Sequence, residues 1–179
     1  RLASPRDSIR CGLGFVPEER KTEWLCLSRS VAENVAMATL ERRQVAGFVR
    51  MARERRTVEG LIGRLRIATP SPAQRVDRLS GGNQQKVVIA RWLVTRPKVM
   101  LFSEPTRGID VAAKEEVYQL IERLASEGAG ILLTSSDMQE VLRLADRILV
   151  MYEGRLVAEF SPDSLSAAEL TRAQWGFAA

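Results

Sequence analysis

Ser103 and Glu104 end a short apolar segment, where their side chains could act on a bound ligand. In "VMLFSEPTRGID", Val99 to Asp110, four apolar residues precede these two polar ones and a proline follows. A buried strand with this ending would deliver its last side chains to a reaction site. Two adjacent carboxylates there would suit a magnesium–nucleotide complex, because Mg²⁺ prefers oxygen ligands. The chain offers a serine and one glutamate instead.

A second candidate site is "LSGGNQQK", Leu79 to Lys86, at the expected start of a helix. Gly81 and Gly82 would let the backbone approach a ligand closely, and Ser80 supplies a hydroxyl. The free N–H groups and the positive end of the helix dipole favour an anion such as phosphate. On these residues alone, a helix cap that binds no ligand is an equally good interpretation.

The two segments together carry a resemblance to a known family. "LSGGNQQKVVIARWL", followed by "VMLFSEPTRGIDVAAKEEVYQLI", resembles the signature motif, Walker B strand and D-loop of an ABC-type ATPase. The forms "GGNQQK" and "EPTRGID" are most similar to the second nucleotide-binding half of bacterial sugar importers of the ribose, galactose and autoinducer class. The resemblance extends from "GFVPEERK" to "VMYEGRLVAEF". It implies an α/β P-loop NTPase core, with a partial parallel sheet and an inserted α-helical signature subdomain.

The resemblance implies a role for several single residues. Glu104 matches the catalytic glutamate, which positions and polarises the attacking water. Ser80, Gly81 and Gly82 would contact the γ-phosphate of ATP held by an opposing nucleotide-binding domain. The remaining candidates for nucleotide contacts are Gln84, Glu18, Asp110 and Ser136. ATP and Mg²⁺ are the cofactors expected of a complete family member, and no residue of this chain is assigned as a metal ligand.

Four departures from the family pattern weaken the expected site. Ser103 stands where the family has the Walker B aspartate, and a neutral hydroxyl cannot offset a divalent cation. Glu18 replaces the usual glutamine, and Ser136 replaces the switch histidine. The phosphate-cradling sequence GxxxxGK[ST] does not occur and is expected upstream of "GFVPEER". We therefore expect a segment of a longer protein, which does not hydrolyse ATP unaided.

Composition bounds the class of protein that carries these motifs. The 179 residues are 45% hydrophobic and 27% charged, as in an ordinary globular protein. No uninterrupted apolar run approaches the ~20 residues of a membrane span. Two cysteines and no histidine exclude the usual zinc spacings, and we expect both thiols to be reduced and packed. The eight arginines and three glutamates of residues 41–66 predict a solvated helical face rather than a nucleic-acid site.

The periodicity of the chain predicts the elements that must position these residues. Strands are expected at 12–16, 99–102 and 130–136, and in two strands of "RILVMYEGRLVAEF" joined by a turn at Glu153 and Gly154. Helices are expected over 30–65, 80–95, 112–126 and 137–144, the first opened by a capping box of Ser30 and Glu33. The alternation predicts a parallel sheet covered on both sides. The three tryptophans, Trp24, Trp92 and Trp175, are expected to pack rather than to stack on bases.

The whole chain, residues 1–179, is expected to form one partial nucleotide-binding domain. Residues 1–21 would hold a core strand and the Q-loop region, 22–95 the helical subdomain, and 96–179 the core with Walker B, D-loop and switch region. The resemblance implies a subunit that couples ATP hydrolysis to import of sugars or related solutes. Its partners would be a second nucleotide-binding domain, transmembrane permease subunits and, indirectly, a periplasmic or extracellular solute-binding protein, with no nucleic acid. It would lie at the cytoplasmic face of the membrane. The alternative is a non-catalytic module that only supplies its signature face to a partner domain.

Overall fold

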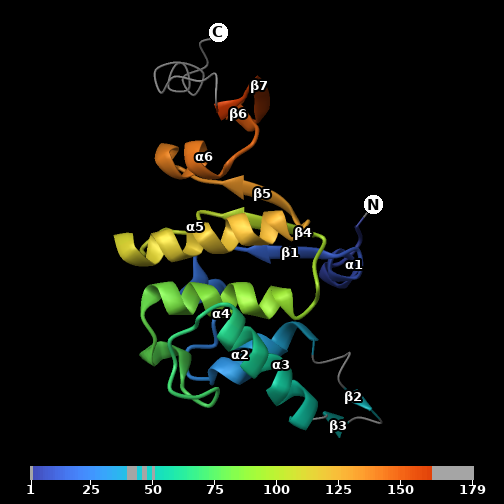
Figure 1. Ribbon diagram of the computed structural model, residues 1–179. Coiled ribbons are helices and arrows are strands. Elements are labelled where there is room, and N and C mark those ends of the chain that lie inside the picture. Colours follow the sequence, from blue (N-terminus) through green and yellow to red (C-terminus); the bar gives the residue numbers. More distant parts are fainter. Residues whose placement is uncertain (1, 40–43, 46–47, 50, 163–179) are drawn as a thin grey trace. The chain divides into compact units, whose positions relative to one another are not determined.

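The computed structural model describes residues 2–39, 44–45, 48–49 and 51–162 (Figure 1). The chain divides into two compact units, Arg1–Leu132 and Leu133–Ala179, and each is described by itself. Among the described residues, no helix has both the length and the hydropathy that crossing a bilayer requires.

The first unit alternates strands with helices. It contains α1 (Pro5–Arg10), β1 (Leu13–Val16), a π-helical turn (Arg20–Trp24), α2 (Val31–Ala36), β2 (Gln44–Val45), β3 (Phe48–Val49), α3 (Met51–Arg64), a 3-10 turn (Val76–Arg78), α4 (Gly81–Leu93), β4 (Val99–Ser103), α5 (Val111–Ser126) and β5 (Gly130–Thr134), whose last residues belong to the second unit. The second unit continues with α6 (Met138–Leu144), β6 (Ile148–Tyr152) and β7 (Arg155–Phe160). The strands and helices expected on either side of residues 40–65 are thus present.

The main sheet has the strand order β1-β4-β5, and β1 runs parallel to β4. Val16 lies opposite Phe102, and both are buried together with Met100. The parallel pairing confirms the prediction, but the expected cover on both faces is wrong. Phe15 is 40% exposed and Leu132 is 53% exposed, so one face of the sheet is only partly covered within this unit. Continuous apolar strands therefore did not mean complete burial.

Helix α4 is the most deeply buried helix of the first unit. Four consecutive residues, Val87 to Ala90, are fully buried, because the helix packs against α2 on one side and α5 on the other (Figure 1). Burial all round explains why its apolar positions exceed a single stripe. Trp92 contacts the Trp24 ring at 5.2 Å between centroids, which confirms packing roles for these two tryptophans. Trp175 lies outside the described residues.

Residues 30–65 are not wholly helical. After α2, the short strands β2 and β3 pair antiparallel, with Val45 opposite Phe48. Valine and phenylalanine favour extended backbone, but the helix formers on either side of them dominate the local sequence pattern, which therefore predicts a helix here. Helix α3 follows, and its Arg55 and Arg56 are exposed, as expected for a solvated face. Arg42, Arg43 and Arg50 lie outside the described residues.

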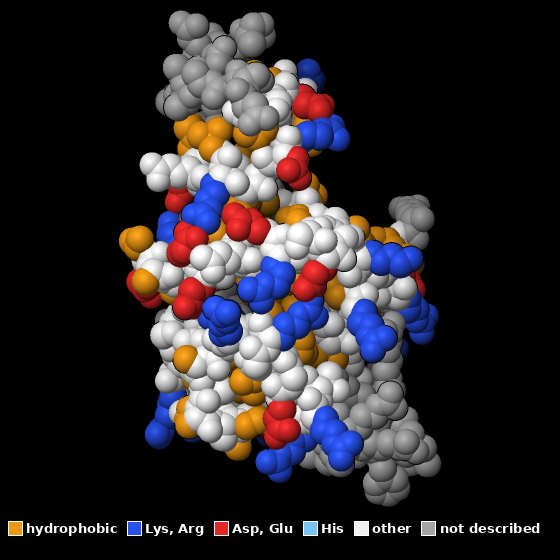
Figure 2. All heavy atoms as spheres, in the orientation of Figure 1, with side chains coloured by type: hydrophobic (Ala, Val, Ile, Leu, Met, Phe, Trp, Pro, Cys, Tyr) orange, Lys and Arg blue, Asp and Glu red, His pale blue; other side chains and the backbone are white. Residues whose placement is uncertain are grey.

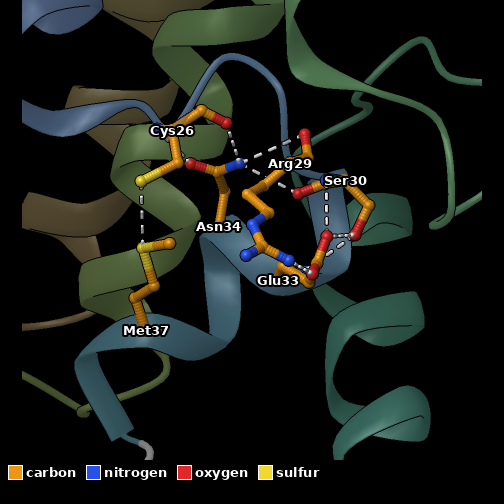
Figure 3. A network of polar contacts seen from close by, with 6 residues as sticks. All are labelled: Cys26, Arg29, Ser30, Glu33, Asn34 and Met37. Carbon is orange, nitrogen blue, oxygen red and sulfur yellow. Dashed lines mark hydrogen bonds and ion pairs between the residues drawn. The ribbon is translucent and has the colours of Figure 1, made fainter.

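A buried amide joins α2, the segment before it and α4. Asn34 is fully buried; its Nδ2 donates to the carbonyls of Cys26 at 3.0 Å and Ser30 at 2.9 Å, and its Oδ1 accepts from the Cys26 N–H at 2.9 Å (Figure 3). Arg91 of α4 donates from Nε to the Asn34 backbone carbonyl at 2.7 Å, and from Nη1 to the Trp24 carbonyl. Burial lowers the pKa of the Arg91 guanidinium, an effect that the nearby Cys26 partly offsets. One asparagine and one arginine thus fix three segments.

The start of α2 has the predicted capping box. The Ser30 hydroxyl accepts from the Glu33 N–H at 3.2 Å, and the Glu33 carboxylate accepts from the Ser30 N–H at 2.8 Å (Figure 3). The cysteines differ from expectation, because Cys11 and Cys26 are free thiols but both are exposed. Asn34 holds the Cys26 backbone, whereas the exposed Cys26 thiol lies 3.9 Å from the Met37 Sδ (Figure 3).

In the second unit, β6 and β7 form the expected hairpin. They pair antiparallel, and the turn residues Glu153 and Gly154 have φ of 46° and 76°. Two positive φ values in a two-residue turn match the twist of the strands, so glutamate takes a position that usually holds asparagine or aspartate. Ile148 and Val150 are the buried centre of this unit, packed against residues of α6.

Candidate functional site

The start of α4 presents a serine hydroxyl at the molecular surface. Ser80 is the exposed N-cap of this 13-residue helix, and its hydroxyl accepts from the Asn83 amide Nδ2 at 2.9 Å. The first N–H groups of a helix have no acceptor within it, and they carry partial positive charge. This end of α4 can therefore accept an anion beside a hydroxyl. Asn83, which sequence reasoning missed, also accepts from the Ala68 N–H at 2.8 Å and so fixes the neighbouring loop.

The two glycines of α4 permit close packing inside the chain. A Cβ built on Gly82 would lie 2.5 Å from the Ala113 Cβ, nearer than real side chains approach. A Cβ on Gly81 would lie 2.9 Å from a terminal nitrogen of Arg20 and 3.3 Å from the Gly108 carbonyl oxygen. The glycines thus let the loop after β4 and the start of α5 lie directly against α4. This intrachain role is separate from any contact with a ligand.

Gln84 points into the protein rather than to the surface. It is 5% exposed, and its Nε2 donates to the carbonyls of Val76 and Leu79, each at 3.2 Å. These bonds hold the loop that enters α4, because they satisfy carbonyls just before the helix. The structure supports a positioning role for Gln84, and its contact with a nucleotide stays a prediction.

Glu104 follows directly after β4 in a strained backbone conformation. Its φ is 47°, in the left-handed region that a residue with a Cβ rarely adopts. The carbonyl of Glu104 accepts from the Arg107 N–H at 3.1 Å, so the chain turns sharply after the strand. Residues held in this region are found disproportionately at functional sites. The half-buried Glu104 and Ser103 lie at the carboxyl end of β4, as the sequence predicted.

The segment after β1 contacts the loop after β4 through two side chains. Glu18 forms an ion pair with Arg107, so this candidate residue lies beside the loop that contains Glu104. Arg20 is 8% exposed and donates to the carbonyls of Arg107 at 2.7 Å and Gly108 at 3.0 Å. Sequence reasoning missed Arg20, whose only signal was its position two residues after Glu18.

Asp110 caps the helix that follows the loop. Its carboxylate Oδ1 accepts from the Ala113 N–H at 3.0 Å, and the residue is exposed. Helix α5 therefore begins with a negative charge at the positive end of its dipole. This cap explains aspartate at this position without a ligand, and a contact across a dimer interface stays a prediction.

Ser136 belongs to the second unit, so it is described apart from the other candidates. It is exposed and precedes Asp137, the N-cap of α6, whose carboxylate accepts from the Gln139 N–H at 3.1 Å. Its role as a switch residue stays a prediction.

Within the first unit, the structure brings most of the candidate residues into one region. Glu18 contacts the loop of Glu104 and Asp110, and that loop packs on Gly81 and Gly82. In the part of the chain that the structure describes, no group of three or more Cys, Asp or Glu side chains is placed to hold a metal ion by itself.

Comparisons with known proteins agree with this arrangement. Residues 3–107 match the family described as ABC transporter. The chain is 44% identical to the ribose import ATP-binding protein RbsA of Rhodopirellula baltica, over 97% of this chain and 34% of the relative. It is 46% identical to the protein of the same name from Chromobacterium violaceum, over 98% of this chain and 35% of the relative. The chain thus spans about a third of the length of these curated relatives.

Solved structures show the same fold. The ATP-binding cassette MJ0796, in a dimeric post-hydrolysis state bound to ADP and Pi, matches with a TM-score of 0.72 at 22% identity, over 90% of this chain and 68% of that one. The protein cbiO1 of Clostridium perfringens, part of an ABC transporter complex, matches with a TM-score of 0.74 at 25% identity, over 96% of this chain and 66% of that one. These matches, with the α/β architecture, confirm the P-loop NTPase fold class.

Proposed function

The chain belongs to the ABC transporter family, and on that premise we propose that it forms part of the ATP-binding component of a sugar importer. In this role it couples ATP hydrolysis to the import of ribose or a related small solute. The relatives named ribose import ATP-binding proteins support the sugar class, since they are 44% and 46% identical over nearly the whole chain.

The observation that carries the proposal is the surface formed by the start of α4. The Ser80 hydroxyl is exposed at the helix N-terminus, and the half-buried Gly81 follows it directly. These groups fit the γ-phosphate of ATP held by an opposing domain, because helix N–H groups and a hydroxyl donate to its oxygens. Bound ATP supplies the phosphoanhydride bond whose hydrolysis drives transport.

Glu104 is the proposed catalytic residue for hydrolysis. Its carboxylate would accept a hydrogen bond from the attacking water and orient that water toward the phosphorus, a contribution of position and charge rather than of covalent chemistry. The turn that begins at its carbonyl fixes where the side chain leaves the backbone. Magnesium is expected of the complete family member, and no step here runs through the metal.

The proposed partners follow from this role. A second nucleotide-binding domain would supply the ATP that meets Ser80, and transmembrane permease subunits would carry the solute. A solute-binding protein outside the membrane would act indirectly, and the chain would lie at the cytoplasmic face. The family membership and the import relatives support these partners. The non-catalytic alternative gains no support from these relatives, which are named as import ATP-binding proteins.

The test is uptake of radiolabelled ribose by cells whose copy of the gene segment encoding this chain has been deleted. We expect ATP-driven uptake to fall to background and to return with the wild-type sequence. The Glu104→Gln variant should not restore uptake, because an amide is a poor general base yet has nearly the same shape. Unlabelled sugars added in excess would identify the solute class by competition.

The control variant for this assay is Arg56→Gln, because Arg56 is an exposed residue of α3. It should restore uptake fully. Normal uptake in the deletion strain would refute the importer role, whereas full rescue by Glu104→Gln would refute the catalytic role of Glu104 alone.

A further inference from the structure

Arg20 is a buried cation that binds main-chain atoms of the loop after β4. Its side chain is almost fully enclosed, and its two terminal nitrogens donate to neighbouring carbonyls, those of Arg107 at 2.7 Å and Gly108 at 3.0 Å. Burial lowers the pKa of this guanidinium, and the charge of Glu19 partly offsets the effect. A planar guanidinium can span two adjacent acceptors, which a lysine ammonium cannot do with the same geometry.

The loop that Arg20 holds has an irregular backbone. Two turns follow each other, closed by the Arg107 N–H on the Glu104 carbonyl at 3.1 Å and by the Ile109 N–H on the Thr106 carbonyl at 3.2 Å. Gly108 has a φ of 65°, so this part of the loop uses the freedom of glycine. Neither a helix nor a strand fixes the carbonyls of residues 107 and 108, and the two terminal nitrogens of the Arg20 guanidinium bind both.

The same guanidinium also lies against the start of α4. A Cβ on Gly81 would come within 2.9 Å of an Arg20 terminal nitrogen and within 3.3 Å of the Gly108 carbonyl oxygen. Arg20, Gly81 and Gly108 therefore meet at one point. This point joins the segment after β1, the helix start that displays Ser80, and the loop between Glu104 and Asp110.

We propose that Arg20 is a positioning residue, which holds the 104–110 loop at a fixed distance from the start of α4. It does not touch nucleotide. It acts through the carbonyls of residues 107 and 108, and so sets where Glu104 and Asp110 stand relative to Ser80. The catalytic part of this inference rests on the proposed function. The structural part, that the loop is held by Arg20, does not.

The first test measures amide hydrogen exchange of the chain with Arg20→Lys, Arg20→Gln and the control Arg56→Gln. Loss of the two guanidinium hydrogen bonds should raise the amide exchange rates of residues 107–110 by about tenfold or more, whereas the rates in β4 and in the centre of α4 should not change. Arg20→Lys keeps the charge and is expected to recover part of the protection. Added guanidinium ion at millimolar concentration should restore protection in Arg20→Gln. Unchanged exchange in both Arg20 variants would overturn the proposal.

The second test measures ATP turnover of the importer complex that contains this chain. For Arg20→Gln we expect kcat to fall by about 10- to 100-fold, while KM for ATP changes by less than about threefold, since a misplaced loop impairs orientation more than binding. Guanidinium ion should recover turnover. Equal kcat in wild type and variant would overturn the positioning role. If the wild-type complex shows no turnover, the proposed function fails, and hydrogen exchange still decides whether Arg20 holds the loop.

Discussion

Gly82 and Ala113 are packed so closely that a Cβ at residue 82 would stand 2.5 Å from the Ala113 Cβ. The start of α4 and the start of α5 can therefore approach each other because Gly82 has no side chain and Ala113 has only a methyl group. The sequence motif suggests that glycine is needed at residue 82 for contact with a phosphate. The packing against Ala113 is by itself enough to require glycine there.

Gly82→Ala should destabilise the chain by about 1–3 kcal/mol, because the added methyl has no room and α5 must shift. Urea unfolding followed by circular dichroism measures this. The double variant Gly82→Ala/Ala113→Gly should recover most of the loss, since it returns the missing space from the other side. Gly60→Ala on α3, where nothing lies within 4 Å, is the matched control and should gain about 0.5–1 kcal/mol. Independent, additive effects of residues 82 and 113 would contradict the close contact.

Asp110→Ala should cost about 1 kcal/mol of unfolding free energy, because α5 loses the N-cap that binds the Ala113 N–H. Asp110→Asn keeps an oxygen acceptor and should retain most of that stability. In the uptake assay, the same two variants distinguish the contribution of the N-cap hydrogen bond from that of the carboxylate charge. If Asp110→Asn is stable but inactive, the carboxylate has a role beyond the cap, and equal stability of the alanine and wild-type chains would exclude the cap itself.

Glu104→Gly should be more stable than Glu104→Ala by about 1 kcal/mol, since only glycine adopts a φ of 47° without a Cβ penalty. At most positions the order is the reverse, and the alanine variant is more stable than the glycine variant. At Ala125, an exposed position on α5, glycine should instead be less stable than alanine by about 1 kcal/mol. Thermal unfolding of wild type and of the three variants Glu104→Gly, Glu104→Ala and Ala125→Gly tests the difference. Alanine and glycine equally stable at residue 104 would mean that the backbone there carries no strain.

Glu33→Gln should lower the free energy of unfolding near neutral pH, and this difference from wild type should disappear at acidic pH. The Ser30 N–H, then the Ser30 hydroxyl, lower the pKa of the Glu33 carboxyl below its ordinary 4.5. The folded-state pKa is lower than the unfolded one, so the stabilisation is present above about pH 4.5 and is lost as the pH falls through the folded pKa. The effect is modest, because Glu33 is exposed and solvent screens its charge.

Urea unfolding of wild type and Glu33→Gln from about pH 7 to about pH 3 measures this convergence. In a Ser30→Ala background the difference between glutamate and glutamine should shrink, because the hydroxyl partner is gone. A constant difference between the two chains across the pH range would show that the carboxylate charge contributes nothing to the cap.

Local sequence signals predicted the elements that begin with distinct residues. Ser30 with Glu33, Ser80 and Asp137 each mark a helix start, because a short polar side chain satisfies N–H groups that the helix leaves free. The residues of β4 likewise predicted a strand. The same reasoning was wrong at β2 and β3, where two-residue strands are too short to show a period against the surrounding helix formers.

The sequence by itself determined the family, the order of the elements and the residue types at the candidate site. It could do so because helix caps, apolar runs and glycine-rich motifs are local properties of the chain. Only the tertiary structure decided that Arg20 binds the loop after β4, that Gln84 is buried and that Gly82 lies against Ala113. These contacts join residues that are distant along the chain or depend on which side of α4 faces a neighbour, and no local pattern specifies that packing.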